Sequence, residues 1–180
     1  MKKNIVPSVI ALIMGVGVAH AANNANAGTI DLGFSGTVSS TTCALVPEVG
    51  GKNGVVDIAL GQTDKQFKGA DVEVTFKPAA DSAAACAAAT TDFVMQWSGV
   101  GSVFSANGLK ASGGAATDSY VLVKATNAKV NNNKQVSADG FQYEFNKSDV
   151  VSGLKYTMNL MGGAKVGDMT AAAQVKHWYK

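Results

Sequence analysis

The chain of 180 residues contains no arginine, only two histidines, and only 16% charged residues. Its lysines are scattered rather than grouped, whereas a nucleic-acid-binding protein carries a basic stripe that contacts phosphates. Nucleic acid is therefore not an expected partner. Fifteen basic residues less Lys2 and Lys3, which lie in the leader described below, leave thirteen to balance thirteen acidic residues. A net charge near zero gives little repulsion between copies of the chain.

The shortage of histidine also limits the possible chemistry. Behind the leader only His177 remains, three residues from the end, so any Ser–His–Asp or Cys–His arrangement would have to use it. Residues 50–52, Gly-Gly-Lys, lack the first glycine and the final Ser or Thr of a phosphate-binding loop. Asp71 and Glu73 alternate with apolar residues, which predicts a solvated strand face rather than an acid–base pair. We therefore expect no enzyme activity, no metal and no other cofactor.

The N-terminus has the three parts of a secretory signal peptide. Lys2 and Lys3 form a basic start, residues 5–19 are apolar, and Ala19-His20-Ala21 is a small-x-small cleavage site. The apolar stretch is too short to span a membrane. We expect a signal peptide at residues 1–21, an N-terminal extension at 22–38 and one β-sandwich domain at 39–180.

The two cysteines, Cys43 and Cys86, both follow the predicted leader. In an exported protein, an even pair of cysteines indicates a disulfide. Closing a loop of this length stabilises a fold by about 4 kcal/mol in the chain-entropy model. A metal site is the weaker interpretation, because two thiols and one histidine do not supply a tetrahedral ligand set.

Short segments with a two-residue hydrophobic period, separated by glycine and asparagine turns, follow one another along the mature chain. The sequence predicts strands at residues 28–38, 55–61, 70–77, 93–97, 120–125, 141–145 and 154–160, and a last strand segment within 169–180. The alanine-rich residues 81–91 predict a loop or one helical turn. This pattern is typical of an all-β sandwich.

The first of these strands is unusual because it lies at the start of the mature chain. One face carries the apolar or small residues Ile30, Leu32, Phe34, Gly36 and Val38. Such a strand can pack into its own domain, or it can add to the sheet of a neighbouring molecule. The alternating pattern by itself leaves both possibilities open.

Several motifs in a fixed order resemble the fimbrial subunits that Gram-negative bacteria assemble by the chaperone–usher route. The alternating extension is followed by Thr41-Thr42-Cys43, by a Val-x-Ile-x-Leu-Gly segment at residues 56–61 and by the second cysteine. Gly167 precedes the penultimate Tyr179 by about a dozen residues, as in that family. Residues 28–30, 47–49 and 97–99 are most similar to the major subunits of fimbriae that bind sialylated glycolipids. The resemblance covers essentially the whole mature chain.

The resemblance implies an incomplete immunoglobulin-like sandwich that is completed by donor-strand exchange. Its expected partners are a periplasmic chaperone, an outer-membrane usher and identical or related fimbrial subunits, one of which donates residues 28–38 to the groove of the next. The expected C-terminal, chaperone-contacting strand carries Val175, His177 and Tyr179 on one face. His177 stands where the family usually has a large apolar residue, which weakens the expected chaperone contact. The expected destination is the fimbria at the cell surface, reached through the periplasm.

The resemblance also implies adhesion to host cells, with a host glycan as a further partner. The expected loops at residues 106–119 and 127–139 are polar, and a lysine could pair with the carboxylate of sialic acid. The candidates are Lys129, Lys134 and Lys165, although for any one of them a solvated turn lysine is the simpler interpretation. A different class of protein also stays open: a self-contained secreted or periplasmic β-sandwich that binds a small ligand as a monomer.

Overall fold

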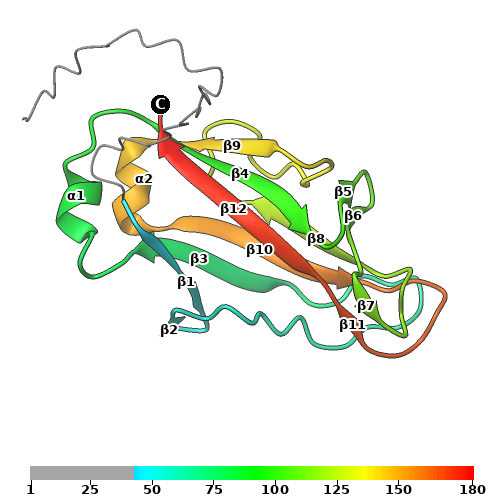
Figure 1. The fold of residues 1–180 in the computed structure, drawn as a ribbon. Helices are drawn as coiled ribbons and strands as arrows, with labels where there is room; N and C mark the ends of the chain where they lie inside the picture. Colours follow the sequence, from blue (N-terminus) through cyan, green and yellow to red (C-terminus); the bar gives the residue numbers. More distant parts are fainter. Residues whose placement is uncertain (1–42) are drawn as a thin grey trace, which may run out of the picture. The chain divides into compact units, whose positions relative to one another are not determined.

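The computed structural model describes residues 43–180, which Figure 1 shows in colour. The predicted signal peptide and the predicted donor-strand residues Ile30, Leu32, Phe34, Gly36 and Val38 lie outside the described residues. The helices are α1 (Ala83–Ala87) and α2 (Lys147–Ser152). The strands are β1 (Leu45–Val49), β2 (Lys52–Asn53), β3 (Val72–Pro78), β4 (Phe93–Val100), β5 (Phe104–Ser105), β6 (Gly108–Lys110), β7 (Gly113–Gly114), β8 (Tyr120–Ala125), β9 (Phe141–Phe145), β10 (Leu154–Met161), β11 (Met169–Thr170) and β12 (Ala172–Tyr179).

The strands form two packed antiparallel sheets and a small third one. The larger sheet has the order β2-β1-β3-β10-β8-β6-β5, and the smaller has the order β12-β4-β9. Strands β11 and β7 pair separately beside the start of β12. In Figure 1, β4 and β12 cross over the strands of the larger sheet, with the core between the two layers. This architecture confirms the all-β, immunoglobulin-like sandwich that the sequence predicts.

The core is built around β10, the middle strand of the larger sheet. Because side chains alternate along a strand, Leu154, Tyr156 and Met158 all point inward, and each is at most 4% exposed. The Tyr156 ring lies 5.3 Å from the ring of Trp97 in β4 and 5.5 Å from that of Tyr143 in β9. These contacts join both sheets, and burial raises the pKa of Tyr156 well above its usual value, so its hydroxyl stays neutral.

Most of the predicted strands are present, but the strand predicted at residues 55–61 is not formed. The segment at residues 55–61 belongs to no strand ladder. Its alternation is nevertheless visible at residues 57–60, because Ile58 and Leu60 pack against the core while Asp57 and Ala59 are exposed. Val56, two residues before Ile58, departs from this pattern and is 83% exposed. Side-chain alternation reports which face of a segment is buried, whereas a strand also needs a partner for its backbone groups.

The two short helices lie at the same end of the sandwich and contact each other. Helix α1 is the single turn expected in the alanine-rich residues 81–91. Helix α2 was not predicted from the sequence. Its Val150 is fully buried, and it ends at Gly153, where φ is +112° and a Cβ would lie 2.4 Å from Thr75 Cγ2. Only glycine fits this turn into β10 without strain.

Candidate functional site

A groove with a volume of about 1060 Å³ opens into the core beside β12. One wall is the unpaired segment at residues 55–61, and the other is the first half of β12, including Val175. The deeper part is apolar and is contributed by both sheets. Its lining includes Phe76, Trp97, Leu109, Val121, Val123, Met158 and Leu160. The hydrophobic interior is therefore accessible from one side of the sandwich.

Strand β12 has an unpaired edge along this groove. It pairs with β4 in a continuous register from Ala172 opposite Val100 to Tyr179 opposite Phe93. Within residues 43–180, no strand pairs with its other edge. An edge strand of this kind presents a row of free N–H and C=O groups to any added strand. The groove and the free edge together form a site for β-strand addition.

The predicted C-terminal residues share the inner face of β12. Val175, His177 and Tyr179 are half-buried, whereas Lys176 and Trp178 between them are exposed. The His177 ring lies 5.5 Å from the Phe93 ring, and its Nε2 is 3.0 Å from the carbonyl oxygen of Cys43. His177 therefore packs and hydrogen-bonds as a core residue. No sequence signal indicated its contact with Cys43.

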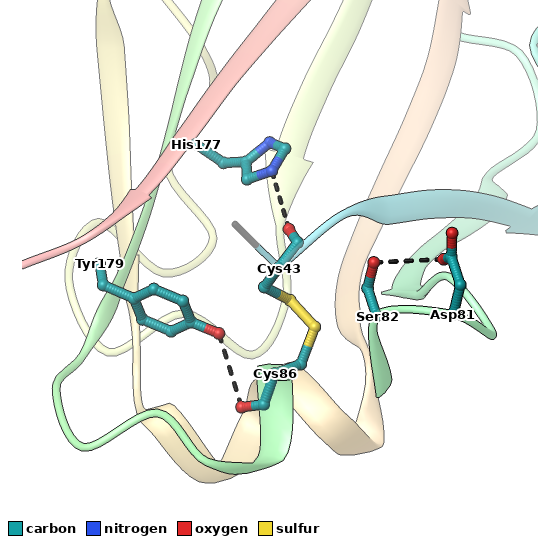
Figure 2. Close-up of a disulfide and its surroundings, with 6 residues drawn as sticks. All are labelled: Cys43, Asp81, Ser82, Cys86, His177 and Tyr179. Carbon is teal, nitrogen blue, oxygen red and sulfur yellow. Dashed lines mark hydrogen bonds between the residues drawn. A yellow bond between two sulfur atoms is a disulfide. The ribbon is translucent and has the colours of Figure 1, made fainter. Parts of the chain in front are cut away.

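The disulfide between Cys43 and Cys86 lies beside the last residues of β12 and confirms the predicted pairing. The two Cα atoms are 4.8 Å apart, and both side chains are about 1% exposed. The Tyr179 hydroxyl donates a hydrogen bond to the Cys86 carbonyl oxygen at 3.5 Å (Figure 2). Burial raises the pKa of Tyr179 above its usual value, so the hydroxyl keeps its proton near neutral pH. The end of β12 is thus held to the start of the described chain.

Trp97 in the groove lining has an unsatisfied polar atom. The residue is 4% exposed, and its buried Nε1 has no hydrogen-bond partner among the described residues. A buried donor without an acceptor costs about 1–3 kcal/mol. Protein cores normally satisfy such groups, so this part of the groove is not a finished core.

The opposite end of the groove is formed by two loops, residues 62–68 and 162–168, which we call the rim. The loops are joined by hydrogen bonds from Gln66 N to Gly163 O, at 3.2 Å, and from Gly162 N to Phe67 O, at 3.0 Å. Asp118 fixes the second loop by accepting hydrogen bonds from the backbone N–H groups of Ala164 and Lys165. Partial desolvation opposes ionisation of Asp118, but these N–H groups prevail and hold its pKa below the usual value.

The three lysines considered for glycan binding have different surroundings. Lys129 Nζ lies 2.5 Å from an Asp92 oxygen and 3.6 Å from a Glu144 oxygen, and this pairing raises its pKa. Lys165 Nζ donates to Thr117 Oγ1 at 2.8 Å, beside the rim. Lys134 lies in an exposed turn. The structure therefore places Lys165 at the groove but Lys129 in an ion-pair cluster.

Comparison with known proteins identifies the family. The F107 fimbrial protein of Escherichia coli is 32% identical over 181 residues, which cover 100% of both chains. The chain belongs to the fimbrial subunits. The K99 fimbrial protein of Escherichia coli is 29% identical over 175 residues, covering 92% of this subunit and 94% of that protein. No family model matches the sequence.

Two solved structures are also similar to this fimbrial subunit. A chaperone–usher pilus subunit is 19% identical over 88% of this chain and 100% of that chain, with a TM-score of 0.49. The P pilus rod subunit PapA is 17% identical over 84% and 100% of the two chains, also with a TM-score of 0.49.

The sequence did not identify most of the groove lining of this subunit. Trp97, Val121 and Met158 lie in predicted strands, and the alternation predicted which strand face each side chain is on. It did not show that these faces line an open groove. The rim loops carried no usable signal. In residues 43–180, no three His, Cys, Asp or Glu side chains are grouped to hold a metal ion, and no helix is long and apolar enough to cross a membrane.

Proposed function

We propose that this protein is a structural, self-polymerising subunit of a fimbria, in which residues 28–38 of one copy enter the groove of another. The observation that carries the proposal is the unpaired edge of β12 beside an open apolar groove. The same chain carries, at its mature N-terminus, an apolar segment with the two-residue period of a strand. A sheet edge and a strand that fits it are thus present in one sequence.

The donor segment has the length of a full strand of this sandwich. At about 3.3 Å per residue, Ile30 to Val38 spans about 26 Å and the eight residues of β12 span about 23 Å. Burying Ile30, Leu32, Phe34 and Val38 would contribute on the order of 6–12 kcal/mol, at about 1.5–3 kcal/mol for each side chain. Gly36 suits a position where the groove leaves no space for a side chain. Backbone hydrogen bonds add to this affinity.

An inserted strand also accounts for residues 55–61. They have the alternation of a strand, they form one wall of the groove, and they have no ladder partner among the described residues. A strand lying between this wall and β12 would supply that partner.

The direction of the inserted strand follows from the two ends of the groove. Strand β12 runs from the rim to the disulfide, where the subunit's own Cys43 occupies the space beside His177. An antiparallel donor, the slightly more stable arrangement, leaves the groove at the rim. Its own folded domain then stands outside the rim, and repetition gives a head-to-tail polymer.

A subunit with an open groove needs protection before it polymerises. An exposed apolar groove and a free sheet edge promote aggregation. A periplasmic chaperone that covers this groove, and an outer-membrane usher that releases the subunit to the next one, are the partners the proposal requires. We place the fimbria at the cell surface after signal-peptide cleavage and export, and we assign the subunit no catalytic role.

Adhesion to host cells, by direct binding of sialylated glycans, is the second part of the proposal. Because Lys129 is already paired with two carboxylates, Lys134 and Lys165 are the better candidates for a sialic acid carboxylate. Purified fibres with Lys134→Ala or Lys165→Ala should bind sialylated glycans more weakly than wild-type fibres. Lys155→Ala, at an exposed β10 position, is the matched control. If wild-type fibres do not bind sialylated glycans, the proposal of direct glycan binding is wrong.

The polymerisation proposal is tested by deleting residues 22–36. We expect the truncated subunit to form a soluble complex with the chaperone, because its groove is intact, but to form no polymer. Native mass spectrometry measures the complex and electron microscopy measures the fibres. Normal fibres from the truncated subunit would refute strand donation. A stable monomer in size-exclusion chromatography without any partner would instead support a self-contained sandwich.

A further inference from the structure

We propose that the rim of the groove docks against helix α1 of the neighbouring copy, the one whose donor strand fills that groove. The contact joins Phe67 and Val166 of one subunit to the alanine surface of α1 in the next. This inference rests on the proposed function, and it adds a second interface between successive subunits. It assigns a role to the exposed Phe67, which does not line the groove, together with the exposed Val166 at the end of the groove lining.

The rim presents these two side chains to solvent. Phe67 is 66% exposed and Val166 is 67% exposed, among the highest values for large apolar residues in the described chain. They lie on the two loops that hydrogen bonds join through Gln66 and Phe67 backbone groups. Both loops contribute to the lining of the groove. The rim is therefore a defined apolar surface at the groove's open end.

Helix α1 presents a complementary surface at the other end of the molecule. It is composed of alanine and Cys86, and Cys86 alone is buried. The outward residues Ala83, Ala84, Ala87 and Ala88 are exposed. Small side chains leave a flat apolar surface that a larger aromatic or branched side chain can cover. The surface is uncharged, so covering it leaves no buried charge unpaired.

The short chain between the donor strand and the domain brings these two surfaces together. Only residues 39–42 separate Val38 from Cys43, so their Cα atoms are at most about 18 Å apart. The disulfide places α1 next to Cys43, with 4.8 Å between the Cα atoms of Cys43 and Cys86. A donor strand that leaves the groove at the rim must therefore hold its own α1 close to the rim. A second copy of this chain is the occupant that this geometry selects.

A small contact between the rim and α1 is sufficient to hold these two surfaces together. The donor strand already joins the two subunits, so docking of the rim is effectively intramolecular and occurs at a high effective concentration. The rim contact would fix the angle between successive subunits and favour completed insertion. Its loss should slow polymerisation without weakening the groove itself.

The test separates the rim from the groove by using two readouts. Mature protein with Phe67→Ser, a rim substitution outside the groove lining, is refolded from denaturant, and its polymerisation is followed by light scattering. Parallel samples take up a fluorescent synthetic peptide of residues 28–38. We expect peptide uptake within about twofold of wild type but polymerisation at least about tenfold slower, a difference of about 1.4 kcal/mol in the activation free energy. Val103→Ser, at an exposed valine outside both surfaces, is the matched control.

A charge exchange tests the partner directly. Phe67→Glu should slow polymerisation, and adding Ala84→Lys should restore the rate at low salt, because each subunit of the polymer carries both changes. Normal polymerisation of the rim variant, or no rescue by Ala84→Lys, would overturn the rim proposal while peptide uptake still supports strand donation. Failure of the wild-type protein to take up the peptide would overturn both. Normal polymerisation of the purified variant combined with absence of fibres on cells would assign the rim to chaperone or usher binding and also overturn the proposal.

Discussion

Strands β10 and β12 have the same length of eight residues but opposite situations in the fold. Strand β10 pairs with β3 and β8, and most of its side chains are buried. Strand β12 pairs only with β4 among the described residues, and none of its side chains is fully buried. The inner residues of both strands are apolar or aromatic, so the difference comes from their neighbours. Strand β10 has a neighbour on both edges, although Met158 and Leu160 in its second half line the groove, whereas β12 lacks a neighbour on one edge.

The comparison shows how a chain can be stable enough to fold and still require a partner. We call the part of the sandwich in which every strand is paired on both edges or covered the closed half. The aromatic cluster around Tyr156 and the disulfide hold this half together. The open half retains the half-buried residues of β12 and the unpaired residues 55–61. Apolar burial stabilises a fold roughly in proportion to the area removed from water. The open half therefore has stabilisation still to gain when a donor strand enters.

The largest effect is expected from removing the disulfide, which joins the start of the described chain to helix α1. Changing both Cys43 and Cys86 to Ser should reduce the free energy of unfolding by about 4 kcal/mol, because the loop of 43 residues is no longer closed in the unfolded chain. Urea denaturation of the peptide-bound subunit under oxidising conditions measures the change. The wild-type protein treated with a reductant should show a similar loss, and equal stability of all samples would contradict this role.

A matched pair of truncations separates the two strands. Leu154→Ala in β10 should cost about 3 kcal/mol, because Leu154 is fully buried and its removal leaves a cavity. Val175→Ala in β12 should cost about 1 kcal/mol or less in the free subunit, because the side chain is only half-buried. The cost at Val175 should rise when the donor peptide is bound. Equal costs with and without peptide would mean that the peptide does not cover this face.

The smallest effect concerns pH and the ion pairs near the end of β12. Hydrogen bonding to Lys180 lowers the pKa of Glu144, and hydrogen bonding to Lys129 lowers that of Asp92. Carboxyl groups whose pKa is depressed by folding stabilise the protein above their unfolded pKa, and this contribution is lost as the pH falls through the folded value. We expect a modest fall in the unfolding midpoint from about pH 5 to pH 3, since the carboxylates are only partly buried and their lysine partners are exposed to solvent.

Asp92→Asn and Glu144→Gln are the variants that check this pH dependence. Each should be less stable than wild type at pH 7 but should lose less stability on acidification. Asp149→Asn, an acid on helix α2, is the control. If the unfolding midpoint falls by the same amount on acidification in wild type and in all three variants, other carboxyl groups cause the acid sensitivity.

The sequence predicted the closed half of the fold well, because its signals are local. Strand β8 occupies the predicted residues 120–125, and the periodic segments around Trp97 and Tyr156 are strands with the expected faces buried. Besides the two- and three-residue strands β2, β5, β6 and β7, two longer elements were missed for physical reasons. Strand β1 contains Pro47 and is half-buried throughout, so it has no clear alternation. Helix α2 has only six residues, too few for a helical period.

The candidate site was harder to predict, because it depends on which residues lack a neighbour. Residues 55–61 have a clear strand pattern, but the pattern does not tell whether a partner strand is present. The position of His177 against Cys43 and the joining of the rim loops at Phe67 and Gly162 are contacts between distant parts of the chain. They arise from packing rather than from local periodicity. Resemblance to a family, and not the residue pattern, indicated the open groove.

Amide hydrogen exchange along β12 tests the unfinished sandwich most directly. Mature subunit released from its chaperone is measured with and without saturating synthetic peptide of residues 28–38. The account predicts that the β12 amides not bonded to β4, together with those of residues 55–61, exchange rapidly in the free subunit and become protected when the peptide binds, while β10 amides are protected in both samples. Strong protection of both β12 edges in the free, monomeric subunit, unchanged by the peptide, would show that the sandwich is already complete and would contradict the account.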